Sequence, residues 1–242
     1  MKFSNVTLLT ILFALLVIFS CNTTKEKENI ITDKPVAYIY GKDTSAVVGT
    51  LVWGNVIPNC PPQGKPNPAV NGSTLTAREQ NLNYHKNRIS IPNEVNYVYS
   101  ITMQQLFDSH DDSLAFSIDN GAAIIGYIMK GNQEVAESCN CYATSSSAYD
   151  THIYLSPIPI TNATKISDCM VMEITPYTRT LHPTWTTKYV NDSLAGKQVK
   201  VSGWLLYDYF HTGESIGTNP NTNSPQRQTV WEIHPIVAIE KL

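Results

Sequence analysis

The strongest constraint on the fold is a series of short β-prone segments in the C-terminal half of the chain. They lie at residues 121–129, 150–155, 169–174, 197–207 and 229–233. Several of them alternate apolar and polar residues, which is the period of a strand with one buried face. A helical pattern at residues 189–194 precedes the fourth segment, and Gly196 can end that helix. The order of strand, strand, strand, short helix, strand and strand predicts a mainly β fold.

The segment between the helical pattern and the fourth strand narrows this prediction. Residues 194–203 read Leu-Ala-Gly-Lys-Gln-Val-Lys-Val-Ser-Gly. This run resembles the Leu-x-Gly-Lys-x-Val-x-Val-x-Gly pattern that members of the OB-fold family commonly show at this point. The resemblance implies a partly open five-stranded barrel over residues 120–242, whose second and third strands present a binding face.

The preceding region, residues 35–119, is predicted to be less regular but to contain β-structure. Two β-prone runs lie at residues 36–40 and 47–53, and the proline-rich loop at residues 58–72 excludes regular structure. Thr102 followed by Gln105 matches a capping box and predicts a short helix up to residue 107. The basic tract at residues 86–88 is interpreted as solvated surface. Pro235 is expected to interrupt the hydrogen bonding of the last strand.

The first residues of the chain predict its location. Lys2 is the only charge before an apolar run at residues 6–19, which has the length of a signal-peptide core. A membrane span needs roughly 20 residues. The run ends in Ile18-Phe19-Ser20-Cys21, which resembles the lipobox of bacterial lipoproteins. The alternatives are an ordinary cleaved signal and an N-terminal anchor helix.

The lipobox resemblance implies that residues 1–20 are removed and that Cys21 carries the lipid, palmitate included. Residues 21–34 are polar and charged without periodicity, as in a flexible tether. We therefore expect a lipid-anchored protein of the bacterial cell envelope, at the outer membrane and facing the periplasm or the surface.

Four cysteines follow Cys21, namely Cys60, Cys139, Cys141 and Cys169. Outside the cytoplasm an even number permits disulfides, and four cysteines allow three pairings. Cys139 and Cys141 are too close for an easy bridge to one another. Either each joins a distant partner, or one or both bind a metal. We expect no free thiol in the mature chain.

Strand alternation gathers polar side chains on one face of the predicted barrel. An OB-like barrel places the third strand beside both the second and the last, so their outward residues share a surface. That candidate binding face consists of Asp150, His152, Tyr154, Glu173, Glu232 and His234.

Three interpretations of this face remain open. In the first, the polar residues pair across the sheet, with Arg179 or Arg227 neutralising the acids. In the second, His152, His234 and Glu173 bind Zn²⁺ or Fe²⁺, and a spare carboxylate acts as a general base. In the third, the face binds a ligand, with Tyr154 stacking on a planar or sugar-like group.

The chain carries 17 basic and 20 acidic residues, a net charge of −3, which disfavours nucleic acid as a partner. We expect a membrane-anchored binding or accessory domain for a small ligand or an envelope protein, with no cofactor. The alternatives are a metal-assisted hydrolase that uses His152, His234, Glu173 and Glu232, and a structural envelope protein.

Overall fold

The computed structural model describes residues 56–92, 98 and 100–242. The expected strands at residues 36–40 and 47–53, the predicted signal peptide and Cys21 lie outside the described residues. Within the described part of the chain, no helix combines the length and the apolar character needed to cross a membrane.

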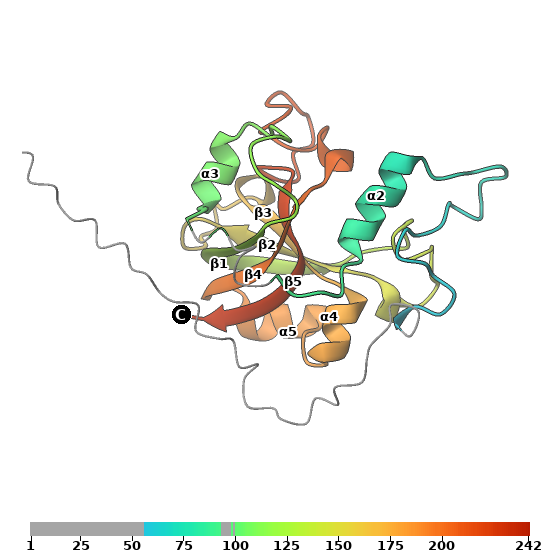
Figure 1. Ribbon diagram of the computed structural model, residues 1–242. Coiled ribbons are helices and arrows are strands. Elements are labelled where there is room, and N and C mark those ends of the chain that lie inside the picture. The colour runs from blue at the N-terminus through green and yellow to red at the C-terminus, as the bar shows by residue number, and fades with distance from the viewer. Residues whose placement is uncertain (1–55, 93–97, 99) are drawn as a thin grey trace, which may run out of the picture. The chain divides into compact units, whose positions relative to one another are not determined.

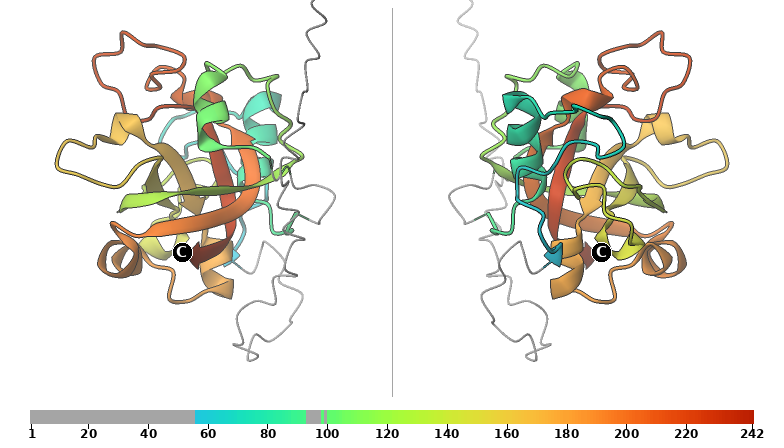
Figure 2. Two further views of the ribbon diagram at one scale, coloured as in Figure 1. Left: turned by 90° about the vertical axis from the view of Figure 1, so that its left-hand side faces the viewer. Right: turned by 90° about the vertical axis from the view of Figure 1, so that its right-hand side faces the viewer.

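Five strands form a closed barrel (Figures 1 and 2). They are β1 (Gly121–Gln133), β2 (Thr151–Ser156), β3 (Met170–Ile174), β4 (Gln198–Tyr207) and β5 (Trp231–Lys241). Their order around the barrel is β1-β2-β3-β5-β4. Neighbouring strands are antiparallel except β3 and β5, which are parallel. This arrangement confirms the mainly β fold and the OB-like barrel in the C-terminal half, although the barrel is closed rather than partly open.

The helices are short. They are α2 (Ala77–Lys86), α3 (Met103–Asp108), α4 (Pro176–Leu181) and α5 (Thr187–Tyr189), which continues into a π-helical turn at Val190–Leu194. Short 3₁₀ turns lie at Ser146–Ala148, Ile166–Asp168 and Tyr209–His211. The predicted capping box of α3 is present, with Thr102 and Gln105 bonded reciprocally. The sequence reasoning missed α2, although Thr76 and Glu79 form the same kind of capping box.

The inner face of the barrel holds the main apolar core. Ile153 and Leu155 of β2, Met170 and Met172 of β3, and Trp231 of β5 all belong to it. In the sequence they alternate with the outward residues of the candidate binding face, so strand alternation places them inside. The alternation therefore predicts correctly which face of β2, β3 and β5 is buried in the core.

Strand β5 continues past Pro235, so the prediction that this proline interrupts the ladder holds only locally. Gly203 pairs with Ile236 and Leu205 pairs with Ile233, with register shifts around Gly203. Proline has no N–H to donate, which explains why the pairing is irregular there. A Cβ on Gly203 would collide with the carbonyl oxygen of Pro235, so this close approach requires glycine.

Three segments cover the outer face of β2, β3 and β5. They are residues 56–92 with α2, the β1–β2 connection at residues 134–150, and the β4–β5 connection at residues 208–230. Glu173 is 0% exposed and His152 and Tyr154 are each 6% exposed. The face that the OB-fold resemblance implies as a binding surface is therefore closed by the chain itself.

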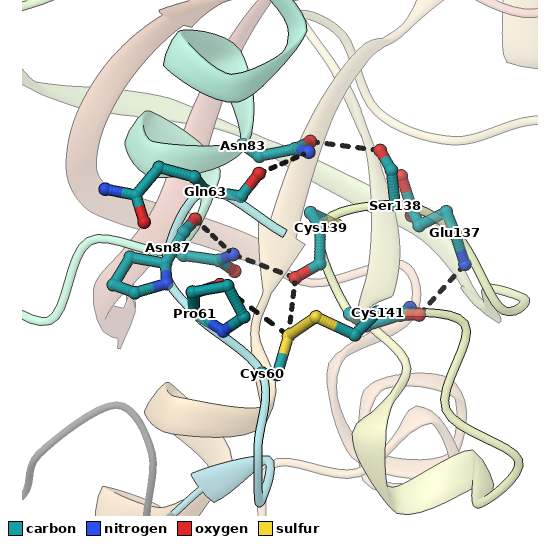
Figure 3. The surroundings of a disulfide bond; sticks show 11 residues. Cys60, Pro61, Gln63, Asn83, Asn87, Glu137, Ser138, Cys139 and Cys141 are labelled. Atoms are coloured by element: carbon teal, nitrogen blue, oxygen red, sulfur yellow. Dashed lines mark hydrogen bonds between the residues drawn. A yellow bond between two sulfur atoms is a disulfide. The ribbon is translucent and has the colours of Figure 1, made fainter. Parts of the chain in front are cut away.

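A disulfide joins the first two covering segments (Figure 3). Cys60 and Cys141 are bonded, with their Cα atoms 5.7 Å apart. The Asn87 side-chain amide, at the end of α2, donates to the carbonyl oxygens of Pro62 at 2.9 Å and Cys139 at 2.8 Å. These bonds hold the end of α2 against the proline-rich loop at residues 58–72 and against the 134–150 connection.

Candidate functional site

The structure brings five of the six candidate face residues together in a buried network. His152 Nε2 lies 2.7 Å from Glu173 Oε1, and His234 Nδ1 lies 3.4 Å from Glu173 Oε2. His234 Nδ1 is also 3.4 Å from Glu232 Oε2, and His234 Nε2 is 3.9 Å from Asp150 Oδ2. We call these five residues, together with Lys86, Asp208 and Arg227, the charged cluster.

Both ring nitrogens of His152 already have partners, because Nδ1 lies 2.9 Å from Glu134 Oε1. Burial would lower the pKa of His152, but the charges of Glu173 and Glu134 and their hydrogen bonds raise it well above its ordinary value. For the carboxyl group of Glu173 the directions are reversed: burial would raise its pKa, but His152 and His234 lower it well below its ordinary value. His152 and Glu173 are therefore a buried ion pair.

Tyr154, the sixth candidate, lies apart from this network. Its ring packs with Cys169 and Val171 in a separate small apolar cluster. The Lys130 ammonium lies 5.4 Å from the ring centroid. With 6% of Tyr154 exposed, its ring does not offer an open stacking surface.

Three further charged residues complete the cluster, and the sequence reasoning placed Lys86 wrongly. Lys86 is buried rather than solvated, and its Nζ lies 2.7 Å from Asp208 Oδ2. Arg227 forms a buried ion pair with Glu232, as the first interpretation of the face proposed. Arg179 instead donates to the carbonyl oxygens of Ser147 and Tyr149. Lys86 is buried because the last turn of α2 packs onto the cluster, where Asp208 compensates the loss of solvation.

Asp150 lies between His234 and Cys139. Its Oδ2 is 3.9 Å from His234 Nε2 and 3.9 Å from Cys139 Sγ. Burial and the charge of Glu173 raise the pKa of Asp150 to about 7. Burial would lower the pKa of His234, but Glu173, Glu232 and Asp150 raise it to about 10.

Potential metal donors fall into two overlapping groups among the described residues. One is Glu137, Cys139 and Asp150, and the other is Asp150, Glu173 and His234. Within each group the donor atoms lie within 4.8 Å of one another. Glu173 and His234 were metal candidates from the sequence, whereas His152 belongs to neither group.

The cysteines differ from the expectation that no thiol remains free. Cys141 has a distant partner in Cys60, but Cys139 and Cys169 form no disulfide within the described residues. Both are buried. Burial raises the pKa of the Cys169 thiol to about 12 and that of Cys139 well above its ordinary value.

An open groove lies away from the charged cluster, between α2, residues 113–118 and the end of β4. Its volume is about 530 Å³. The aromatic rings of Phe116, Tyr207 and Tyr209 line it, together with His85 and Arg78. We call this recess the α2 groove. The sequence reasoning did not find it, because its walls come from three separate segments.

The α2 groove carries a positive charge beside an aromatic ring. Of the side chains that line it in the described part of the chain, only Arg78 is permanently charged. The Arg78 guanidinium lies 3.6 Å from the centroid of the Tyr209 ring, a cation–π contact that limits its freedom. Burial lowers the pKa of His85, which favours its neutral form.

Comparisons with models of protein families, with curated proteins and with solved structures found no match for this chain. Its own geometry offers two arrangements with different chemistry. The charged cluster is buried and internally paired, whereas the α2 groove is open and combines aromatic surface with one cation.

Proposed function

We propose that the chain is a lipid-anchored, extracytoplasmic binding domain that takes a small organic anion in the α2 groove. The groove itself carries this proposal. Its volume of about 530 Å³ falls within the roughly 300–1,000 Å³ of small-molecule sites. Aromatic rings provide apolar contact area for a planar ligand, and the Arg78 guanidinium can pair with a carboxylate, sulfonate or phosphate.

Accessibility favours the α2 groove over the charged cluster. Glu173, Glu232 and His234 are each 0% exposed. A ligand or a hydrolysable substrate would reach them only if the covering segments moved. The groove needs no such movement, so binding there is the function that the geometry supports best.

Replacing Arg78 with glutamine will weaken the binding of an aromatic anion at least tenfold. A hydrogen bond to a charged group contributes about 1.5–3 kcal/mol, which corresponds to about a tenfold change or more. The probe is naphthalene-2-sulfonate, measured by isothermal titration calorimetry on the chain carrying Cys21→Ser, which removes the predicted lipid.

Two further variants make this test specific. Lys65→Gln removes an exposed cation outside the groove and should leave the affinity unchanged. Ala115→Trp fills the groove from its exposed wall and should abolish binding. Equal affinities in Arg78→Gln and Lys65→Gln, or no heat of binding in the unsubstituted groove, would contradict the proposal.

The lipid anchor is tested separately at Cys21. In bacteria fed with an alkyne analogue of palmitate, the unsubstituted chain should be labelled and should sediment with the outer membrane. Cys21→Ser should lose the label, because no thiol remains at the lipobox, while Cys169→Ser should keep it. Membrane sedimentation of an unlabelled, unsubstituted chain would instead indicate an anchor helix.

A further inference from the structure

His234 presents one unpaired nitrogen inside the charged cluster. Glu232 and Glu173 hold its Nδ1 at 3.4 Å each, and Arg227 in turn pairs with Glu232. The opposite nitrogen, Nε2, has no hydrogen-bond partner among the described residues, although the side chain is 0% exposed. In a neutral imidazole one ring nitrogen keeps a free lone pair, so Nε2 can bind a metal ion.

The spacing around Asp150 suits a bound cation. The 3.9 Å between Asp150 Oδ2 and His234 Nε2 is too long for an N–H···O hydrogen bond, which spans about 2.7–3.2 Å. The same oxygen is 3.9 Å from Cys139 Sγ. Ligand bonds of about 2.0–2.3 Å around a tetrahedral zinc ion place two ligands roughly 3.3–3.6 Å apart. These two gaps need to close by a few tenths of an ångström, and the Cys139 and His234 side chains, which share no donor group, must also move towards each other.

We propose that Cys139, Asp150 and His234 bind a single structural transition-metal ion, with zinc as the preferred metal. A thiolate, a carboxylate and an imidazole are the donor types that zinc takes in proteins. A carboxylate at the second nitrogen of a ligating histidine is the usual arrangement around such ions, and Glu232 and Glu173 supply it here. This site is independent of the α2 groove.

The surroundings of the three donors are consistent with a structural metal. The donor groups around Cys139 and around His234 have Asp150 in common, but Cys139 and His234 belong to different groups. Both side chains must therefore turn towards Asp150 to share one ion. Glu137 and Glu173 lie close enough to provide a fourth ligand. The Lys86 ammonium, which Asp208 holds at 2.7 Å, also lies 3.5 Å from Glu137 Oε2. Since all three donors are buried, the ion would tie the 134–150 connection to β5 rather than meet a substrate.

Cobalt provides a direct optical test on the full chain carrying Cys21→Ser. We expect one Co²⁺ per chain, with the visible bands of tetrahedral cobalt and a near-ultraviolet thiolate-to-cobalt charge-transfer band. Zinc should displace the cobalt. Cys139→Ser should lose the charge-transfer band and bind zinc at least about tenfold more weakly, whereas Cys169→Ser, the matched buried cysteine, should retain both properties.

The test remains decisive even where Cys139→Ser does not fold. With Cys60 and Cys141 in a disulfide, Cys139 is the one thiol left in the Cys21→Ser, Cys169→Ser chain. A charge-transfer band in that chain assigns the sulfur to Cys139. Absence of cobalt bands, visible bands without charge transfer, or loss of the band in Cys169→Ser alone would each overturn the proposed site.

Discussion

Replacing Lys86 with methionine will lower the free energy of unfolding by about 3–5 kcal/mol. The substitution keeps the length of the side chain but leaves Asp208, whose side chain is 0% exposed, without its cation at 2.7 Å. Removing one partner of a buried ion pair leaves an uncompensated charge in the interior, which accounts for this magnitude. Urea denaturation followed by circular dichroism measures the loss.

The controls separate charge from packing. Lys65→Met changes an exposed lysine and should leave the unfolding free energy unchanged. The double variant Lys86→Met, Asp208→Leu removes both charges and should recover most of the stability. A loss below about 1 kcal/mol in Lys86→Met would show that the pair does not hold α2 in place.

The pH dependence of the same pair has a defined sign. Burial would raise the pKa of Asp208, but the charges of Lys86 and His211 lower it from 3.8 to about 2. A lowered carboxyl pKa stabilises the fold above the unfolded-state value, and this contribution is lost as the pH falls from about 4 towards 2. The difference in stability between the unsubstituted chain and Lys86→Met should therefore shrink over that interval.

Replacing both Cys60 and Cys141 with serine will lower the free energy of unfolding by about 2–5 kcal/mol. The bond closes a loop with a sequence separation of 81 residues, for which the loss of chain entropy alone corresponds to roughly 4.5 kcal/mol. Urea denaturation under non-reducing conditions measures the change. Because the bond joins two covering segments, amide hydrogen exchange should accelerate more in α2 than in β1.

Cys169→Ala serves as the control, because it removes a buried sulfur that takes part in no disulfide. Its expected cost is smaller than that of the double replacement. Thiol counting on the denatured, unreduced Cys21→Ser chain should find two thiols, those of Cys139 and Cys169. Four titratable thiols, or equal destabilisation by Cys169→Ala, would contradict the disulfide assignment.

Strand alternation predicted the barrel and its inner face because that signal is local. A residue's inward or outward direction depends on its position within its own strand, so Ile153, Met172 and Ile233 could be assigned to the core from sequence alone. The same periodicity, combined with the OB-like strand order, indicated that His152, Glu173 and His234 share a face. In the structure these three side chains do lie together.

The closure of that face could not be predicted, because it depends on contacts between distant parts of the chain. Nothing in the sequence around Lys86 indicates that Asp208 will meet it, so a basic tract looks like solvated surface. The pairing of Cys141 with Cys60 rather than with Cys169 could not be predicted either, since the spacing of cysteines does not determine disulfide pairing. The α2 groove could not be predicted from the sequence for the same reason, because three separate segments form its walls.

The position of Asp208 has a consequence for the order in which the molecule is assembled. During synthesis, which starts at the N-terminus, α2 is made well before β4 and before Asp208, which follows β4. Until then Lys86 has no buried anion at 2.7 Å to compensate its desolvation, so water remains its better environment. We therefore expect α2 to dock only after β4 and the start of the β4–β5 connection are in place.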